Sequence, residues 1–198
     1  MKKGRLEAFS DGVLAIIITI MVLEIKVPHG VEFADLKELL PIFLSYLLSF
    51  VYIGIYWNNH HHMMQTVTKV TGDILWANLH LLFWLSLIPF ATGWIGENHL
   101  SAAPMTLYGI ILFMAGVSYV ILQARIIKNQ GENSLLARAV GTDLKGKSSA
   151  VLYLAAIGLS WLNPWIAVSI YIFIALVWLI PDKRIERILN DDSVKNEE

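Results

Sequence analysis

Four long runs of the sequence contain no charged residue, and they restrict what this 198-residue chain can fold into. The runs cover residues 39–68, 74–96, 98–124 and 148–181, so they are 30, 23, 27 and 34 residues long. A helix needs about 20 predominantly apolar residues to cross the core of a bilayer. The runs therefore predict an all-α, polytopic membrane protein, and a mean hydropathy of +0.59 agrees.

Composition excludes several other classes. The chain has no cysteine, so disulfides, thiolate metal sites and cysteine nucleophiles are ruled out. Its net charge is −1 and its Lys and Arg residues lie in loops and tails, which argues against a nucleic-acid partner. No nucleotide-binding loop, catalytic triad or zinc-protease motif is present, so neither an enzyme nor a bound cofactor is predicted.

Six membrane-spanning helices are predicted. The longest run would make a helix of about 51 Å, too long for a bilayer core of about 30 Å, and Asn163-Pro164 near its middle is a turn signal. It is therefore divided in two. The predicted helices are about 6–27, 39–63, 74–95, 103–125, 148–162 and 164–181. Residues 1–181 would form one membrane domain, and residues 182–198 a cytoplasmic tail.

The distribution of positive charge supports six spans. With that count, thirteen Lys and Arg residues lie on one side of the membrane and two, Lys26 and Lys37, lie on the other. Cytoplasmic loops are usually the richer in Lys and Arg. Both termini are therefore predicted to be cytoplasmic.

The first helix has one largely apolar face. Gly12, Ile16, Thr19, Ile20 and Leu23 recur at helical spacing and share that face. Periodicity alone favours a stripe that faces lipid or packs within the bundle. The Thr19 hydroxyl could equally bond to the carbonyl four residues earlier in its own helix.

The start of this helix carries a more specific pattern, R-x-x-x-F-S-D, formed by Arg5, Phe9, Ser10 and Asp11. This pattern closely resembles the opening of the first helix in the transmembrane protein 175 family, the lysosomal potassium channel and its prokaryotic relatives. Further matches are Trp57, His60, Asn78 and Pro89-Phe90.

The resemblance implies a potassium channel built from six helices per repeat. With one repeat, this chain is similar to the prokaryotic members, which are homotetramers. It is then expected in a prokaryotic plasma membrane, with the lipid bilayer, further copies of itself and monovalent cations as partners. The permeant potassium ion would be its ligand, and the family has no re-entrant selectivity-filter loop.

The resemblance also implies roles for the first helix, four copies of which would line the pore. Ile16 takes the constriction, with Ile20 and Leu23 above it on the same face. A ring of isoleucines has no oxygen to replace an ion's hydration shell, so it would act as a hydrophobic gate by dewetting. Thr19 supplies the only hydroxyl beside this ring and is expected to favour potassium over sodium modestly.

The motif at the predicted cytoplasmic end has a different expected role. A charge at membrane depth needs a partner, and Arg5 is poorly placed to pair with Asp11 on one face. We therefore expect these side chains to hold the helix end in register, with a supporting network from the second helix: Arg5, Phe9, Ser10 and Asp11, supported by Trp57 and His60. Direct attraction of cations by Asp11 remains an alternative.

Two rival functions use other groups. A proton-coupled secondary transporter would use Asp11 or His60 to carry the proton, but no acidic residue falls at the middle of a predicted span, which favours the channel. A metal site in the tract His60-His61-His62 is disfavoured because consecutive helical residues point in different directions. Glu24 could form an acidic ring at the outer mouth or end the helix in solvent.

Overall fold

The computed structural model describes residues 2–98, 100–141 and 143–179, and all of its regular structure is helical. The predicted tail at 182–198 lies outside these residues. The α-helices are α1 (Lys3–Leu23), α2 (Leu40–Gln65), α3 (Gly72–Ser86), α4 (Ile88–Glu97), α5 (Ala102–Gln130), α6 (Leu135–Val140), α7 (Leu144–Leu159) and α8 (Pro164–Leu179), with a 3₁₀ helix η1 (Phe33–Leu39) before α2.

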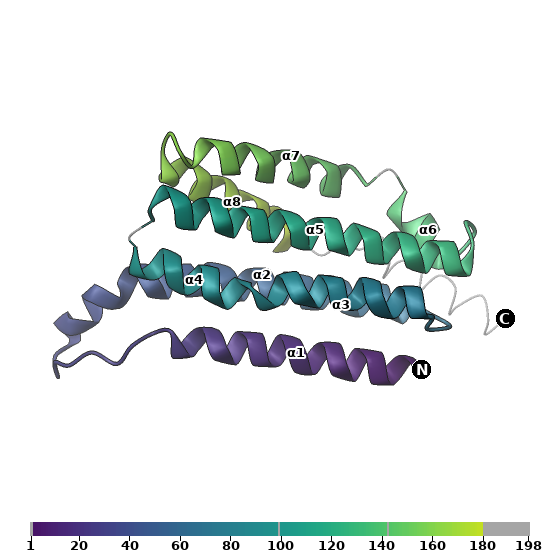
Figure 1. The fold of residues 1–198 in the computed structure, drawn as a ribbon, viewed down its shortest axis with the longest axis horizontal. Helices are drawn as coiled ribbons and strands as arrows, with labels where there is room; N and C mark the ends of the chain where they lie inside the picture. Colours follow the sequence, from purple (N-terminus) through teal and green to yellow (C-terminus); the bar gives the residue numbers. More distant parts are fainter. Residues whose placement is uncertain (1, 99, 142, 180–198) are drawn as a thin grey trace.

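The helices form a bundle in which α1 occupies one side (Figure 1). α1 packs against α2, α3 and α4, whereas α5 packs against α3 and α4 on one side and α7 and α8 on the other. α7 consequently lies on the opposite side of the bundle from α1 (Figure 1). One face of α1 is thus left without any neighbour in the described chain.

The prediction of six spans is wrong. Only four segments of the described residues are long and apolar enough to cross a membrane, judged by length and composition: Lys3–Leu23, Phe33–Gln65, Gly72–Glu97 and Ala102–Gln130. α7 and the described part of α8 have 16 residues each, or about 24 Å at 1.5 Å per residue, which is less than the bilayer core. The assignment of both termini to the cytoplasm depended on the six-span count and loses its basis with it.

The third predicted helix is interrupted. α3 ends at Ser86 and α4 begins at Ile88, so the segment Gly72–Glu97 contains a break at Leu87. Pro89 explains the break, because it has no N–H to donate and its ring collides with the carbonyl four residues earlier.

Two glycines allow helices to approach closely in the core. A Cβ added to Gly96 on α4 would lie 2.9 Å from the Ile42 Cα on α2. A Cβ added to Gly109 on α5 would meet the hydroxyl of Tyr171 on α8 and the side chain of Ile157 on α7. Real Cβ atoms essentially never lie that close to other atoms. Both positions therefore require glycine, which has no Cβ.

Candidate functional site

α1 has a buried face that attaches it to the bundle. Leu6, Ser10, Leu14, Ile17 and Met21 are at most 4% exposed and recur every three or four residues. This stripe faces α2, α3 and α4, the helices that α1 contacts. The helix is therefore oriented by apolar packing on one side.

The face singled out by periodicity is the opposite, uncovered one. Ile16, Ile20 and Leu23 are 58%, 43% and 77% exposed, and Gly12 and Thr19 are exposed as well. A row of large apolar side chains on the surface indicates contact with lipid, with another copy of the chain or with an ion pathway. All five residues are thus available to a neighbour outside the described chain.

Thr19 uses its hydroxyl proton within its own helix. Its Oγ1 donates to the Ile16 carbonyl at 2.9 Å, three residues earlier and not four. A hydroxyl oxygen that donates its proton keeps two lone pairs as acceptors. Because the side chain is exposed, this oxygen remains accessible beside the Ile16 side chain.

A buried chain of hydrogen bonds joins α1 to α3 and α2. The Ser10 hydroxyl donates to the Leu6 carbonyl at 2.9 Å and accepts from Asn78 Nδ2 at 3.0 Å. Asn78 Oδ1 lies 2.7 Å from His60 Nε2. Ser10 and Asn78 are fully buried and His60 is 3% exposed, so the whole chain is shielded from water.

The order of these bonds assigns the protons. Ser10 has one proton and gives it to a carbonyl, so it must accept from the amide nitrogen of Asn78. That orientation points the amide oxygen at His60, whose Nε2 must then carry the hydrogen.

Asp11 has its partner on α2. Trp57 Nε1 donates to Asp11 Oδ1 at 3.0 Å, on the exposed side of the helix pair. The Trp57 ring also stacks on His61, with centroids 6.1 Å apart and an interplanar angle of 21°. Of the two candidates named for Asp11, Trp57 makes the contact and His60 bonds to Asn78 instead.

The motif residues Arg5 and Phe9 make no comparable link. Phe9 is 52% exposed, and Arg5 is exposed with no ion pair among the described residues. The structure brings Ser10 and Asp11 to the neighbouring helices and leaves Arg5 and Phe9 on the outside.

Two further contacts were not indicated by the motif. Lys3 Nζ donates to the Gln65 carbonyl at 3.0 Å and so links the first turn of α1 to the last residue of α2. Asn78 is the junction between Ser10 and His60. A polar side chain within an apolar helix is a signal for such a junction, since it must find a partner inside the bundle; a bond to a backbone carbonyl leaves no sequence signal.

The other end of α1 carries exposed charges. Lys26 Nζ donates to Glu97 Oε1 at 2.8 Å, and this bond raises the pKa of Lys26 above its ordinary value. Glu24 ends α1 and is exposed next to Gly93 on α4. The ion pair of Lys26 and Glu97 contributes little to stability, because both side chains are solvated.

The histidine tract does not converge on one point. His60 turns inward to Asn78, His61 stacks outward on Trp57, and His61 Nε2 lies 2.9 Å from Gln65 Nε2. Within the described part of the chain, no three His, Asp or Glu side chains gather as a metal site would require.

Comparisons with known proteins bear on this site. Residues 5–89, which include most of α1 and the whole buried chain of hydrogen bonds, match a model of the family described as endosomal/lysosomal potassium channel TMEM175. A protein of Chryseobacterium named a potassium channel is 58% identical over 97% of this chain and 100% of its own length. One of Chamaesiphon minutus, also named a potassium channel, is 33% identical over 89% of this chain and 93% of its own.

A solved structure resembles the whole bundle. It is the crystal structure of a lysosomal potassium-selective channel TMEM175 homologue from Chamaesiphon minutus. The two chains superpose with a TM-score of 0.78 and 28% identity, covering 91% of this chain and 97% of the other.

Proposed function

The chain belongs to the TMEM175 family of potassium channels, and from this premise we propose that it conducts potassium through a pore lined by α1. It is a membrane protein and a channel, not an enzyme. The observation that carries the proposed pore is the uncovered face of α1, where Ile16, Ile20 and Leu23 stand on the surface while the opposite stripe is buried.

A single chain cannot enclose a pore with this face. Several copies with their α1 helices facing a common axis would cover it, and a homotetramer is the assembly proposed here. Closed rings of identical subunits are the ordinary way to build such an axis. The bacterial relatives support a prokaryotic plasma membrane as the location.

Ile16 is the proposed constriction. Its side chain is the most exposed large apolar group in the middle of α1, at 58%, whereas Ile17 beside it is 4% exposed. A ring of such groups offers an ion no oxygen, so it lowers conduction by expelling water from the narrowest point. Widening the ring or making it polar would therefore raise flux.

Thr19 is the proposed source of selectivity. Its oxygen is an exposed acceptor one helical turn from Ile16, after its proton has gone to the Ile16 carbonyl. A cation that has shed part of its water at the constriction would find this oxygen next. Potassium holds its water less tightly than sodium, so this arrangement favours potassium by a modest factor.

The test is ion flux in liposomes that contain the purified protein, under potassium and then sodium gradients, with Ile16→Asn as the variant. Val22→Asn is the matched control, because Val22 is 45% exposed on the same helix but about 120° away from Ile16. We expect potassium flux above sodium flux, increased by Ile16→Asn and unchanged by Val22→Asn. Equal increases in both variants would place the pore elsewhere.

The same liposomes distinguish the rival function. A proton-coupled transporter would show no uncoupled potassium flux and would take up cations only when a proton gradient is imposed. That result would contradict the channel.

A further inference from the structure

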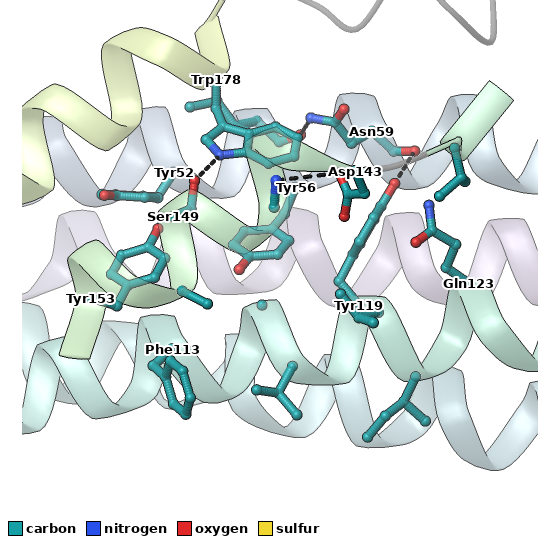
Figure 2. Close-up of a pocket in the computed structure, with 18 of the residues that line it drawn as sticks. Tyr52, Tyr56, Asn59, Phe113, Tyr119, Gln123, Asp143, Ser149, Tyr153 and Trp178 are labelled. Atoms are coloured by element: carbon teal, nitrogen blue, oxygen red, sulfur yellow. Dashed lines mark hydrogen bonds between the residues drawn. The ribbon is translucent and has the colours of Figure 1, made fainter.

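A pocket lies between α2, α5, α7 and α8, away from the pore-facing surface of α1 (Figure 2). Its volume is about 280 Å³, close to the lower limit of small-molecule sites, about 300 Å³. A single water needs only about 10–15 Å³ measured the same way. The pocket is thus large enough for a ligand and lies outside the site described above.

Most of the pocket wall is apolar. Aromatic rings from four helices surround it, among them Tyr56, Phe113, Tyr153 and Trp178. Several polar atoms of this wall are already bonded: Trp178 Nε1 donates to Ser149 Oγ at 2.9 Å, and Asn59 Nδ2 donates to the Ile55 carbonyl at 2.8 Å. Water inside would find few partners, so replacing it with an apolar group is favourable.

Polar side chains gather at one end of the pocket. α2 and α5 run in the same direction, because Tyr56 bonds to the Leu112 carbonyl and Tyr119 bonds to the Asn59 carbonyl one to two turns further along. Asn59 and Gln123 consequently share an end, and Figure 2 shows Asp143 beside them. Phe113 and Tyr153 line the other end (Figure 2).

Charges of both signs border the pocket. Asp143 Oδ1 accepts from the Gly146 amide at 3.2 Å as the cap of α7. Lys145 Nζ lies 4.5 Å above the Trp178 ring. A ligand of either sign would meet a like charge here, whereas an uncharged hydrogen-bonding group would find an acceptor in the Asn59 amide oxygen and both a donor and an acceptor in the Gln123 carboxamide.

We propose that this pocket binds an amphiphile with one uncharged hydrogen-bonding head group and a single alkyl or aryl chain. The head group lies against Asn59 and Gln123, and the chain extends between the rings of Tyr56, Phe113 and Tyr153. Val120 on α5, 48% exposed, marks the opening. The ligand can come from the bilayer or from water, and the experiment separates these sources.

Gly116 provides a variant that fills the pocket. It lines the wall, and a Cβ added there would meet only the Tyr56 hydroxyl, at 3.8 Å, which is ordinary contact. Gly116→Leu extends a branched chain into the space, and Gly116→Ala leaves most of it open. Gly158→Leu adds the same side chain at an exposed site on α7 with no atom near its Cβ.

The probe is octanol that carries a photoreactive diazirine on its chain, with labelled residues mapped by mass spectrometry. We expect saturable labelling of pocket residues such as Tyr56 and Tyr119, reduced about tenfold by Gly116→Leu, a loss of about 1.4 kcal/mol. Gly116→Ala and Gly158→Leu should label as the parent does. Labelling that does not saturate, or that Gly116→Leu leaves unchanged, would overturn the proposal.

A competition arm needs no variant and so holds even if Gly116→Leu fails to fold. Excess decanol without the diazirine should abolish labelling of the pocket in the unaltered protein, and its failure to do so would also overturn the proposal.

Native mass spectrometry then identifies the source of the ligand. A neutral lipid that copurifies with the parent but not with Gly116→Leu indicates the bilayer, whereas an empty parent that takes up added decanol indicates a soluble ligand. Binding is read without ion flux, so either result is independent of the proposed pore.

Discussion

The amide nitrogen of Asn78 donates to the hydroxyl of Ser10 at 3.0 Å, and this buried bond joins α3 to α1. The amide oxygen continues the chain to His60 on α2. Three helices therefore meet in one set of polar contacts from which water is excluded. In such surroundings, removing one partner costs more than the bond itself contributes.

Asn78→Leu should destabilise the protein. The substitution keeps the side-chain size but leaves the Nε2 hydrogen of His60 buried without an acceptor, at a cost of about 1–3 kcal/mol. Thermal unfolding in detergent, followed by size-exclusion chromatography, measures the loss. Asn129→Leu is the control, because that exposed amide bonds only to its own helix. Equal melting temperatures for the two variants would contradict the junction.

The contact between Trp57 and Asp11 should be weaker. Both groups are exposed, so water replaces the bond when either one is removed. A double-mutant cycle with Trp57→Phe and Asp11→Ala, read as free energies of unfolding, should give a coupling of about 1 kcal/mol or less. A coupling of about 3 kcal/mol would mean that the pair is shielded, as in an assembly that covers this end of α1.

Thr19→Val should reduce the preference for potassium without closing the pore. Valine keeps the branched shape but removes the oxygen beside Ile16. The ratio of potassium to sodium flux in liposomes should fall toward one, and Thr19→Ser, which keeps the hydroxyl, should retain it. An unchanged ratio in Thr19→Val would assign the hydroxyl a purely structural role.

Gly109→Ala should destabilise the packing of α5 against α8. The new methyl group would collide with the Tyr171 hydroxyl, and overpacking of this kind costs about 1–3 kcal/mol. Gly158→Ala adds the same methyl group to α7 in open space and should stabilise the helix by about 0.5–1 kcal/mol. Opposite shifts in melting temperature are the expected result; a parallel change would show that Tyr171 moves aside freely.

The helices could be anticipated from the uncharged runs, but their ends could not. The sequence predicts a helix over 103–125, whereas α5 continues to Gln130 and ends where Gly131 adopts a φ of 93°. Arg125 and Lys128 end the apolar run without ending the backbone hydrogen bonds. At α7 the start is set by the Asp143 cap and not by hydropathy.

Hydropathy also gave the wrong number of membrane spans. The run 148–181 is apolar enough to suggest two spans, yet the described helices on either side of Asn163-Pro164 are each 16 residues long. Apolar side chains serve equally to pack against α5 and to face lipid, so an uncharged run does not by itself identify a span.

Periodicity grouped the residues of α1 but did not say which group faces inward. Ile16 and Ile20 are as apolar as Leu14 and Ile17, and only the packing of α2, α3 and α4 separates the two faces. The sequence indicates two possible partners for Asp11, Trp57 and His60. In the structure His60 bonds to Asn78, which leaves Trp57 as the partner of Asp11. No local sequence pattern encodes the bond between His60 and Asn78, because the two residues lie on different helices.

The polar attachments of α1 to its neighbours are concentrated near one end. Lys3, Ser10 and Asp11 all bond to other helices, whereas the buried stripe beyond them is apolar, and the next polar link is the solvated pair of Lys26 and Glu97 after the helix has ended. A tilt of α1 about Ser10 would therefore keep these three bonds close to their present lengths while it displaced the far end of the helix. The arm from Ser10 to Leu23 is about 20 Å long, so a tilt of about 5° displaces Leu23 by nearly 2 Å and Ser10 hardly at all.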